Sequence, residues 1–209
     1  MKSRFIAIEG NIGAGKTTLA NMLAKDLNAR LMLEQFAENP FLPLFYENPE
    51  KYAFPLELSF LGERFEQMKN ILVADLFRPI IVSDYYILKS LLFARINLGD
   101  AEYQLFNKLY HLIADTFPKP DLLIYLNTEV AYLQENIKKR GRSYETGIKD
   151  DYLKKLHNSY LKSFKEVQNI PVLIVNTEGK DFVDSPLIYD RIANSIQQDF
   201  TPGIQFLNL

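Results

Sequence analysis

A glycine-rich stretch near the start of the chain constrains the fold more than any other feature of the sequence. It reads GNIGAGKTT, follows the apolar segment 5–9, and precedes an amphipathic helical pattern. Glycines in such a turn let successive backbone N–H groups point at a polyphosphate, and the following helix adds the positive end of its dipole. Lys16 can bridge the outer phosphates, and the Thr17 hydroxyl can ligate Mg²⁺. An ordinary glycine-rich connection is the less favoured alternative. The predicted triphosphate-binding residues are Gly10, Asn11, Ile12, Gly13, Ala14, Gly15, Lys16, Thr17 and Thr18.

Short apolar runs alternate with longer helical patterns along the whole chain. Continuous apolar strands between helices are typical of a parallel sheet that is covered on both faces. We therefore expect an α/β fold of the P-loop NTPase type, with a five-stranded parallel sheet flanked by helices, in a single domain over residues 1–209. The predicted strands are 5–9, 30–33, 79–83, 122–126 and 172–175. The predicted helices are 56–76, 86–96, 102–117, 130–139, 152–167 and 187–200.

The composition of the chain argues against several classes of binding partner and of chemistry. The net charge of −2 gives no global attraction to nucleic acid or to an anionic membrane, and no apolar stretch approaches membrane length. The absence of cysteine excludes disulfides, thiolate metal sites and a cysteine nucleophile. We expect a cytoplasmic protein that binds neither nucleic acid nor membranes.

Two acidic residues follow predicted strands and should converge on the glycine-rich loop. Ligands of such sheets bind at the carboxyl ends of the strands. Glu34 follows the second strand, where a carboxylate can accept the proton of a hydroxyl that attacks a γ-phosphate; a solvated loop acid is the alternative. Asp84 follows the third strand, where it can hold Mg²⁺ or cap the next helix.

A cluster of cations, KKRGRSYE, directly follows the fourth predicted helix. Such clusters are often solvated surface charge. Beside a triphosphate site, however, the pattern favours a mobile arginine-rich lid over about 138–147. Arg140 and Arg142 would then stabilise the transferring phosphate, and Gly141 and Gly147 would supply hinge-like freedom.

Taken together, these motifs resemble the deoxyribonucleoside kinase family, in particular its bacterial purine-preferring branch. The resemblance covers nearly the entire chain and rests on the glycine-rich loop, the segments LEQF and NPF, Arg64, and the lid RGRSYE. It implies that ATP and Mg²⁺ are used and that Glu34 is the general base for the 5′-hydroxyl of a deoxynucleoside. It also implies that Glu145 reaches the 3′-hydroxyl, which Tyr46 shares, and that Asp84 is the acid of a Glu/Asp-Arg-Ser motif.

Three departures from the family pattern concern the substrate. The arginine of the Glu/Asp-Arg-Ser motif is Tyr85 here, and its serine is Tyr86. Lys89, one helical turn onward, is the candidate substitute for the arginine. By its spacing from Arg64, the base-reading glutamine of the family becomes Glu57. Glu57 and Arg64 lie two turns apart on one helical face, so both are predicted to reach one edge of the base. A carboxylate best matches the adjacent donors of guanine, whereas an arginine–carboxylate pair formed by these two residues can present a donor and an acceptor to adenine. With the family's leaning to purines, we rank deoxyadenosine first, deoxyguanosine second and deoxycytidine third, with thymidine unlikely.

Two alternatives remain open at this level. A thymidylate kinase-like protein would share the loop but carry an Asp-Arg pair where this chain has Asp84 and Tyr85. A non-catalytic nucleotide-binding protein on the same fold would explain the lost arginine. The chain is also predicted to form a homodimer, because the segments 56–76 and 86–106 carry more large apolar residues than one covered face needs. These residues are Phe60, Phe65, Tyr86, Leu91, Leu92 and Phe93.

Overall fold

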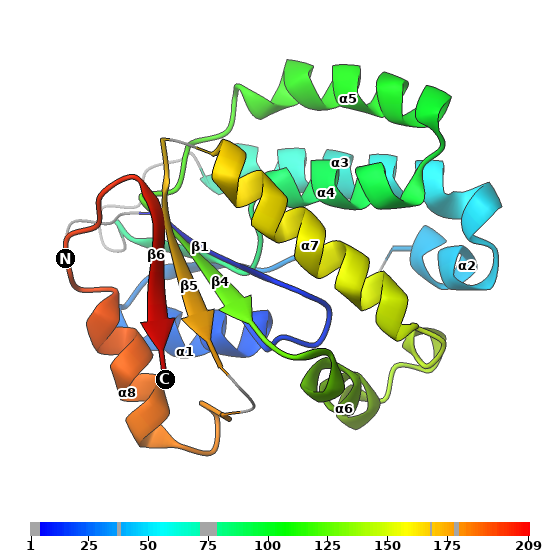
Figure 1. Cartoon of the computed structure of the whole chain (residues 1–209). Coiled ribbons are helices and arrows are strands. Elements are labelled where there is room, and N and C mark those ends of the chain that lie inside the picture. The colour runs from blue at the N-terminus through cyan, green and yellow to red at the C-terminus, as the bar shows by residue number, and fades with distance from the viewer. Residues whose placement is uncertain (1–4, 37–38, 72–78, 168, 178–179) are drawn as a thin grey trace.

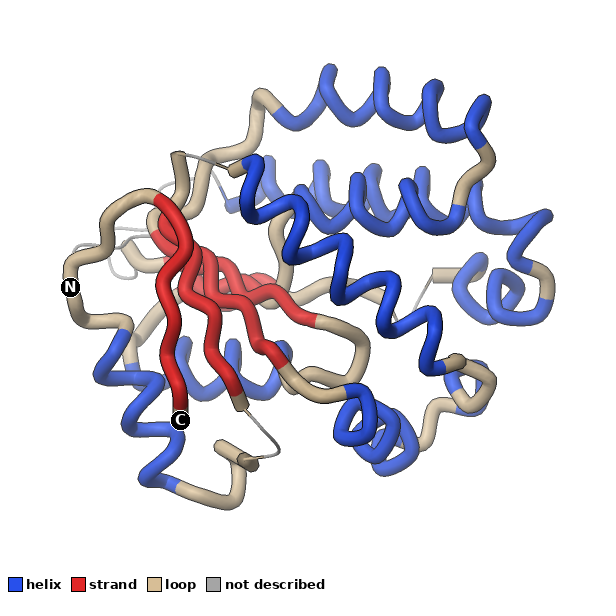
Figure 2. The backbone as a smooth tube through the Cα atoms, viewed as in Figure 1, coloured by secondary structure: helices blue, strands red, loops and turns tan. Residues whose placement is uncertain are grey.

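The apolar segment before the glycine-rich loop lies at the centre of a parallel sheet. The computed structural model describes residues 5–36, 39–71, 79–167, 169–177 and 180–209. Within these residues six strands form one sheet in the order β2-β3-β1-β4-β5-β6, with every neighbouring pair parallel (Figure 2). The strands are β1 (Phe5–Gly10), β2 (Arg30–Met32), β3 (Ile81–Ser83), β4 (Leu122–Asn127), β5 (Pro171–Asn176) and β6 (Gly203–Asn208).

Helices cover both faces of this sheet (Figure 1). Side chains of α1, α6 and α8 pack with β1 and β4 in one core cluster, and side chains of α4 and α7 pack on the opposite face. A third cluster joins α3, α4 and α5 into a helical layer beyond the sheet. The helices are α1 (Lys16–Asp26), α2 (Phe41–Glu47), α3 (Pro49–Ile71), α4 (Leu88–Asn97), α5 (Asp100–Ala114), α6 (Val130–Arg140), α7 (Asp150–Glu166) and α8 (Pro186–Ser195), with the short 3₁₀ helix η1 (Ser143–Glu145).

The expectation of a five-stranded sheet was wrong, because β6 adds a sixth strand. The sequence predicted a helix over 187–200, whereas α8 ends at Ser195 and the chain then returns to pair with β5. Strand β6 lies at the sheet edge, where none of its six residues is fully buried. It therefore lacks the continuous apolar run by which the central strands are recognised.

The helical layer also begins earlier than predicted. Helix α3 starts at Pro49 and contains Pro55, and the short helix α2 precedes it. The predicted helix 56–76 extends into residues 72–78, which lie outside the described residues. No helix within the described ranges is both long and apolar enough to cross a membrane.

The parallel arrangement brings the carboxyl ends of all strands to one edge. All six residues of β1 are buried, and each large apolar side chain buried in this way contributes about 1.5–3 kcal/mol. This rigid centre holds the loop after β1 beside the residues that follow β2 and β3.

Candidate active site

The conformation of the glycine-rich loop depends on its glycines and on contacts with neighbouring helices. Gly13 and Gly15 have φ of 82° and 88°, and a Cβ atom on Gly13 would lie 2.7 Å from the carbonyl oxygen of Leu133. Only glycine fits this position. The side chain of Asn11 donates to the carbonyl of Leu153 at 2.7 Å, so α7 supports the loop from behind.

The lysine of the loop points back across it. Lys16 Nζ donates to the carbonyl oxygen of Asn11 at 2.7 Å. Burial, followed by the positive charge of Lys89, lowers the pKa of Lys16 to about 8. A triphosphate would provide the negative charge that this lysine lacks, as expected for a group that binds outer phosphates.

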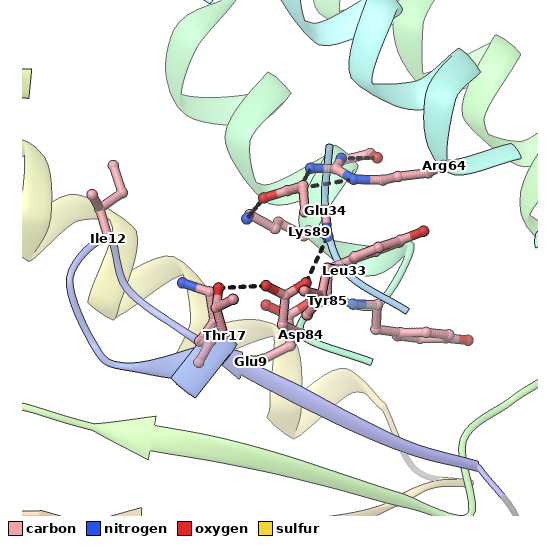
Figure 3. A network of polar contacts seen from close by, with 12 residues as sticks. Glu9, Ile12, Thr17, Leu33, Glu34, Arg64, Asp84, Tyr85 and Lys89 are labelled. Atoms are coloured by element: carbon pink, nitrogen blue, oxygen red, sulfur yellow. Dashed lines mark hydrogen bonds and ion pairs between the residues drawn. The ribbon is translucent and has the colours of Figure 1, made fainter. Parts of the chain in front are cut away.

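Glu34 lies between two cations (Figure 3). Its Oε1 accepts hydrogen bonds from Arg64 Nε, at 3.2 Å, and from Arg64 Nη2, and its Oε2 accepts one from Lys89 Nζ. Burial alone would raise the pKa of Glu34, but Lys89 and Arg64 outweigh it and hold that pKa well below its usual range. The alternative of a solvated loop acid does not fit this buried ion triad.

Asp84 joins the loop to the second strand (Figure 3). Its Oδ2 accepts a hydrogen bond of 2.6 Å from the Thr17 hydroxyl, and its Oδ1 accepts one of 2.8 Å from the backbone N–H of Glu34. It does not cap the next helix, because α4 begins at Leu88 with Ile87 in the capping position.

Thr17 and Asp84 suit Mg²⁺, which prefers hard oxygen ligands. Within the described ranges no group of three or more His, Cys, Asp or Glu residues is placed to hold a metal.

Tyr85 lies in the core, with the centroid of its ring 5.6 Å from the guanidinium carbon of Arg64. It is fully buried, and its hydroxyl donates to Gln67 Oε1 at 2.5 Å. The arginine missing from position 85 therefore has no counterpart there, and Lys89 is the cation that reaches Glu34. Sequence reasoning missed Glu9, whose carboxylate lies below the triad and accepts hydrogen bonds from Tyr86 N and the Tyr160 hydroxyl (Figure 3). An acid at the end of an otherwise apolar strand was the available signal.

The predicted lid is folded over the site. Glu145 is 4% exposed and accepts hydrogen bonds from Arg140 Nη2 and, at 3.1 Å, from Arg142 Nη1. The guanidinium of Arg142 also lies 3.7 Å from the ring centroid of Phe36. Tyr144 stacks on Tyr46 with ring centroids 5.9 Å apart. Arg140, Arg142 and Glu145 therefore form an ion-paired cluster, whereas Lys138 and Lys139 are exposed, and the contact of Tyr144 was not foreseen.

Two cavities meet at the glycine-rich loop. The first, here called the acidic cavity, contains every predicted substrate residue: Glu34, Tyr46, Glu57, Arg64, Asp84 and Glu145. The second, here called the loop cavity, is lined by the glycine-rich loop and by Thr128, Tyr132, Asn136, Thr177 and Phe182. Both are bordered by Lys16, Thr17, Phe36, Arg140 and Arg142. A phosphate held at this shared border would face both cavities.

Glu57 occupies another part of the acidic cavity. Its side chain is 2% exposed, and its Oε1 accepts a hydrogen bond of 2.7 Å from Asn97 Nδ2. The Tyr152 hydroxyl in turn donates to Asn97 Oδ1 at 3.0 Å. Arg64 is not paired with Glu57 as the sequence suggested, because its guanidinium bonds Glu34 and Ser90. This chain of Glu57, Asn97 and Tyr152 joins three helices and could not be read from spacing.

Lys16 of the glycine-rich loop borders both cavities, and so do Arg140 and Arg142. A glycine-rich loop of this kind beside a second cavity that contains carboxylates is typical of a P-loop phosphotransferase that acts on a small acceptor. Comparison with known proteins gives the family. The sequence model described as "Deoxynucleoside kinase" matches residues 6–201, and the chain belongs to this family. It is thus a deoxynucleoside kinase, an ATP-dependent phosphotransferase.

Relatives and solved structures match over almost their full length. The chain is 38% identical to the "Deoxyguanosine kinase" of Bacillus subtilis (strain 168), covering 93% of this chain and 96% of the relative. It is 32% identical to the "Deoxyadenosine kinase" of Dictyostelium discoideum, covering 100% and 83%. The structure of deoxyadenosine kinase from M. mycoides with bound dATP matches with a TM-score of 0.80 at 26% identity, covering 93% and 100%.

Proposed function

We propose that this chain transfers the γ-phosphate of ATP to the 5′-hydroxyl of a purine deoxynucleoside, with deoxyguanosine preferred to deoxyadenosine. The observation that carries the proposal is the acidic cavity, which holds the Glu34 ion triad, a buried base-directed carboxylate at Glu57, and a shared border with the triphosphate loop.

In this reaction Glu34 accepts a hydrogen bond from the 5′-hydroxyl and directs that oxygen at the γ-phosphorus. A carboxylate between two cations is a weak base, so it takes the proton late, as the new O–P bond forms and the hydroxyl becomes acidic. The bond from the γ-phosphorus to the bridging oxygen breaks, and ADP leaves. Lys89 and Arg64 keep Glu34 oriented throughout.

The cations at the border of the two cavities stabilise the transferring phosphoryl group. Lys16, Arg140 and Arg142 face the position where its equatorial oxygens gain charge. We propose that Thr17 and Asp84 hold Mg²⁺, which when bound neutralises charge on the phosphates of ATP. These residues offer the oxygen ligands that this ion requires.

A nucleoside suits the acidic cavity better than a nucleotide. Glu34 and Glu145 both border it as hydrogen-bond acceptors, which suit the hydroxyl groups of a sugar, and each carboxylate already compensates two of the cations that could otherwise bind a 5′-phosphate. Tyr46 and Glu145 are proposed to bind the 3′-hydroxyl, since both border the same cavity: Glu145 belongs to the lid, and Tyr46 stacks on Tyr144 of the lid. This argues against thymidylate kinase-like chemistry.

The order of the two purines rests on Glu57. The ranking of deoxyadenosine first relied in part on an arginine–carboxylate pair, but Arg64 is engaged by Glu34 and Ser90. An unpaired carboxylate accepts hydrogen bonds only, and guanine offers it two adjacent donors, N1–H and the 2-amino group. The similarity to a protein named "Deoxyguanosine kinase" supports the same order.

Saturation kinetics with ATP, Mg²⁺ and each of the four common deoxynucleosides test the proposal. We expect the highest kcat/KM for deoxyguanosine at about pH 8, with deoxyadenosine second. A higher value for thymidine or deoxycytidine than for both purines would refute the assignment of Glu57 to the base.

We also propose that the chain forms a two-fold homodimer. Most of the apolar residues that suggested pairing are packed within the chain, including Phe65, Tyr86, Leu91 and Leu92. However, Leu105 and Leu112 lie seven residues apart on α5 and are 51% and 76% exposed. Helix α5 is the outermost helix of its layer in Figure 1, so this face is available for pairing.

A further inference from the structure

The carboxyl group of Glu57 is buried at the wall of the acidic cavity with half of its hydrogen-bonding capacity unused. Oε1 accepts from Asn97, and within the described part of the chain no donor reaches Oε2. The side chain borders the space in which the base of the acceptor would lie. The base of the acceptor is therefore the hydrogen-bond partner that we expect for Oε2 of Glu57.

The charges around Glu57 do not fix it as an anion. The groups that face it are Arg64 of its own helix, Lys89 and Asn97 of α4, Glu34 after β2, and the Tyr152–Asn97 contact from α7. Arg64 and Lys89 are both bonded to Glu34, whose single negative charge offsets half of their combined positive charge. Burial, only partly opposed by Asn97 and these cations, raises the pKa of Glu57 to about 7.

We propose that Glu57 selects between the two purines through its own protonation state: the carboxylate binds guanine and the neutral acid binds adenine. This inference rests on the proposed deoxynucleoside kinase function and concerns the regulation of the same site. Glu57 is here called the selector, because its preference between the two purines changes with pH near neutrality.

The hydrogen-bonding edges of the two bases explain the selection. A carboxylate accepts from both N1–H and the 2-amino group of guanine, whereas it would face the lone pair of adenine N1. A neutral carboxylic acid has one donor and one acceptor, which match adenine N1 and the 6-amino group. A wrong protonation state leaves a buried polar group unpaired, which is the strongest source of discrimination in such sites.

Tyr152 acts as a positioning residue for this selector. Burial raises its pKa well above the usual range, so its hydroxyl stays protonated and donates to Asn97 Oδ1. That bond turns the Asn97 amide so that its N–H₂ faces Glu57, which favours the carboxylate. Without the hydroxyl, the amide oxygen is free to turn towards Glu57 and favour the neutral acid.

Competition between the two substrates tests the proposal directly. Deoxyguanosine and deoxyadenosine are mixed in one reaction with ATP and Mg²⁺, and the ratio of the two monophosphates gives the ratio of kcat/KM. Groups that affect both substrates equally, such as Lys16, cancel in this ratio. We expect the ratio to rise with pH between about 6 and 8, by up to about tenfold for each pH unit.

Two variants serve as controls. Glu57→Gln keeps the shape of the side chain and offers a fixed donor and acceptor, so its ratio should not vary with pH and should favour deoxyadenosine. Tyr152→Phe should lower the ratio at pH 7 relative to the parent chain, and it provides the test if the first variant does not fold.

The outcomes separate this inference from the proposed function. Absence of phosphorylation of both purines would refute the function itself. Phosphorylation with a ratio that is constant across this pH range, or with the same slope in Glu57→Gln, would overturn the selector. An unchanged ratio in Tyr152→Phe would likewise contradict the role of the hydrogen-bond chain.

Discussion

At the scale of single residues, the central feature is a carboxylate whose two oxygens are bonded by different cations. Glu34 is held by Arg64 on one side and by Lys89 on the other, and all three side chains are buried or nearly so. The two cations fix the orientation of the Glu34 carboxylate, and they make it a weaker base because they stabilise its ionised form. It suits a reaction in which the acceptor oxygen must be aimed and the proton leaves late.

Replacement of Glu34 by glutamine should reduce kcat by about a hundredfold or more, because the amide cannot accept the hydroxyl proton. ATP binding should change little, since the glycine-rich loop is not touched. Steady-state kinetics and a direct ATP-binding titration on the same preparation provide the measurement. A near-normal kcat would remove Glu34 from the mechanism.

We expect Lys89 to be essential for turnover, and we expect Tyr85 to be dispensable for it. Lys89→Met should lower kcat by about a hundredfold, and Lys89→Arg should restore much of the loss, because a cation again reaches Glu34. Tyr85→Phe is the matched control: it loses the bond to Gln67 at a cost of about 1 kcal/mol in stability but keeps the ion triad. Equal losses of kcat in Lys89→Met and Tyr85→Phe would contradict this division of roles.

Glu34, Asp84 and Thr17 could be foreseen because each follows a parallel strand or belongs to the glycine-rich loop. The topology of the sheet forces such positions together. The partners Glu9, Asn97 and Tyr152 could not be foreseen in the same way. Their contacts depend on how α4 and α7 pack against the sheet, which periodicity does not reveal.

At the scale of elements, the lid is a short connection held by its own ion pairs. Helix α6 ends at Arg140 with Gly141 in the left-handed conformation, at φ 70°, and η1 follows directly. Arg140 and Arg142 both form ion pairs with Glu145, and these pairs hold the segment together. If these arginines moved to bind a phosphoryl group, they would exchange the carboxylate of Glu145 for phosphate oxygens.

Removal of either lid arginine should affect turnover more than substrate binding. Arg140→Ala and Arg142→Ala are each predicted to lower kcat by at least about tenfold with a smaller change in the KM for the deoxynucleoside, because their contacts tighten in the transition state. Lys138→Ala, an exposed neighbour on the same helix that borders neither cavity, serves as the control. If the two arginine variants changed KM alone, the lid would have no role in the chemical step.

The elements differed in how well the sequence predicted them. Strands β1, β4 and β5 are continuous apolar runs, and their central residues are buried as expected. Strand β6 was missed because an edge strand alternates between partly buried and exposed residues. Helix α2 was missed because its seven residues are too few to establish a helical period.

At the scale of the whole molecule, an entirely parallel sheet places the donor and acceptor sites at one edge. The loop cavity and the acidic cavity share five lining residues, and we propose that the two substrates meet at this shared border. The helical layer of α3, α4 and α5 extends away from the sheet, and it supplies both Glu57 and the exposed face of α5.

The proposed dimer gives a prediction at this scale. The parent chain should sediment as a dimer at micromolar concentration, and Leu112→Lys should sediment as a monomer, because it places a charge in the apolar face of α5. Leu187→Lys, an equally exposed leucine on α8, is the matched control and should remain dimeric. A monomeric parent chain would refute the dimer.

The most direct test of the central claim compares two acceptors that differ by a single phosphate. The protein is incubated with ATP and Mg²⁺ and either deoxyguanosine or its 5′-monophosphate, and the products are identified by ³¹P NMR. The account predicts that deoxyguanosine is converted to the 5′-monophosphate with one ADP formed per product, and that the monophosphate is not phosphorylated further. Conversion of the monophosphate to a diphosphate, with deoxyguanosine left unchanged, would contradict it.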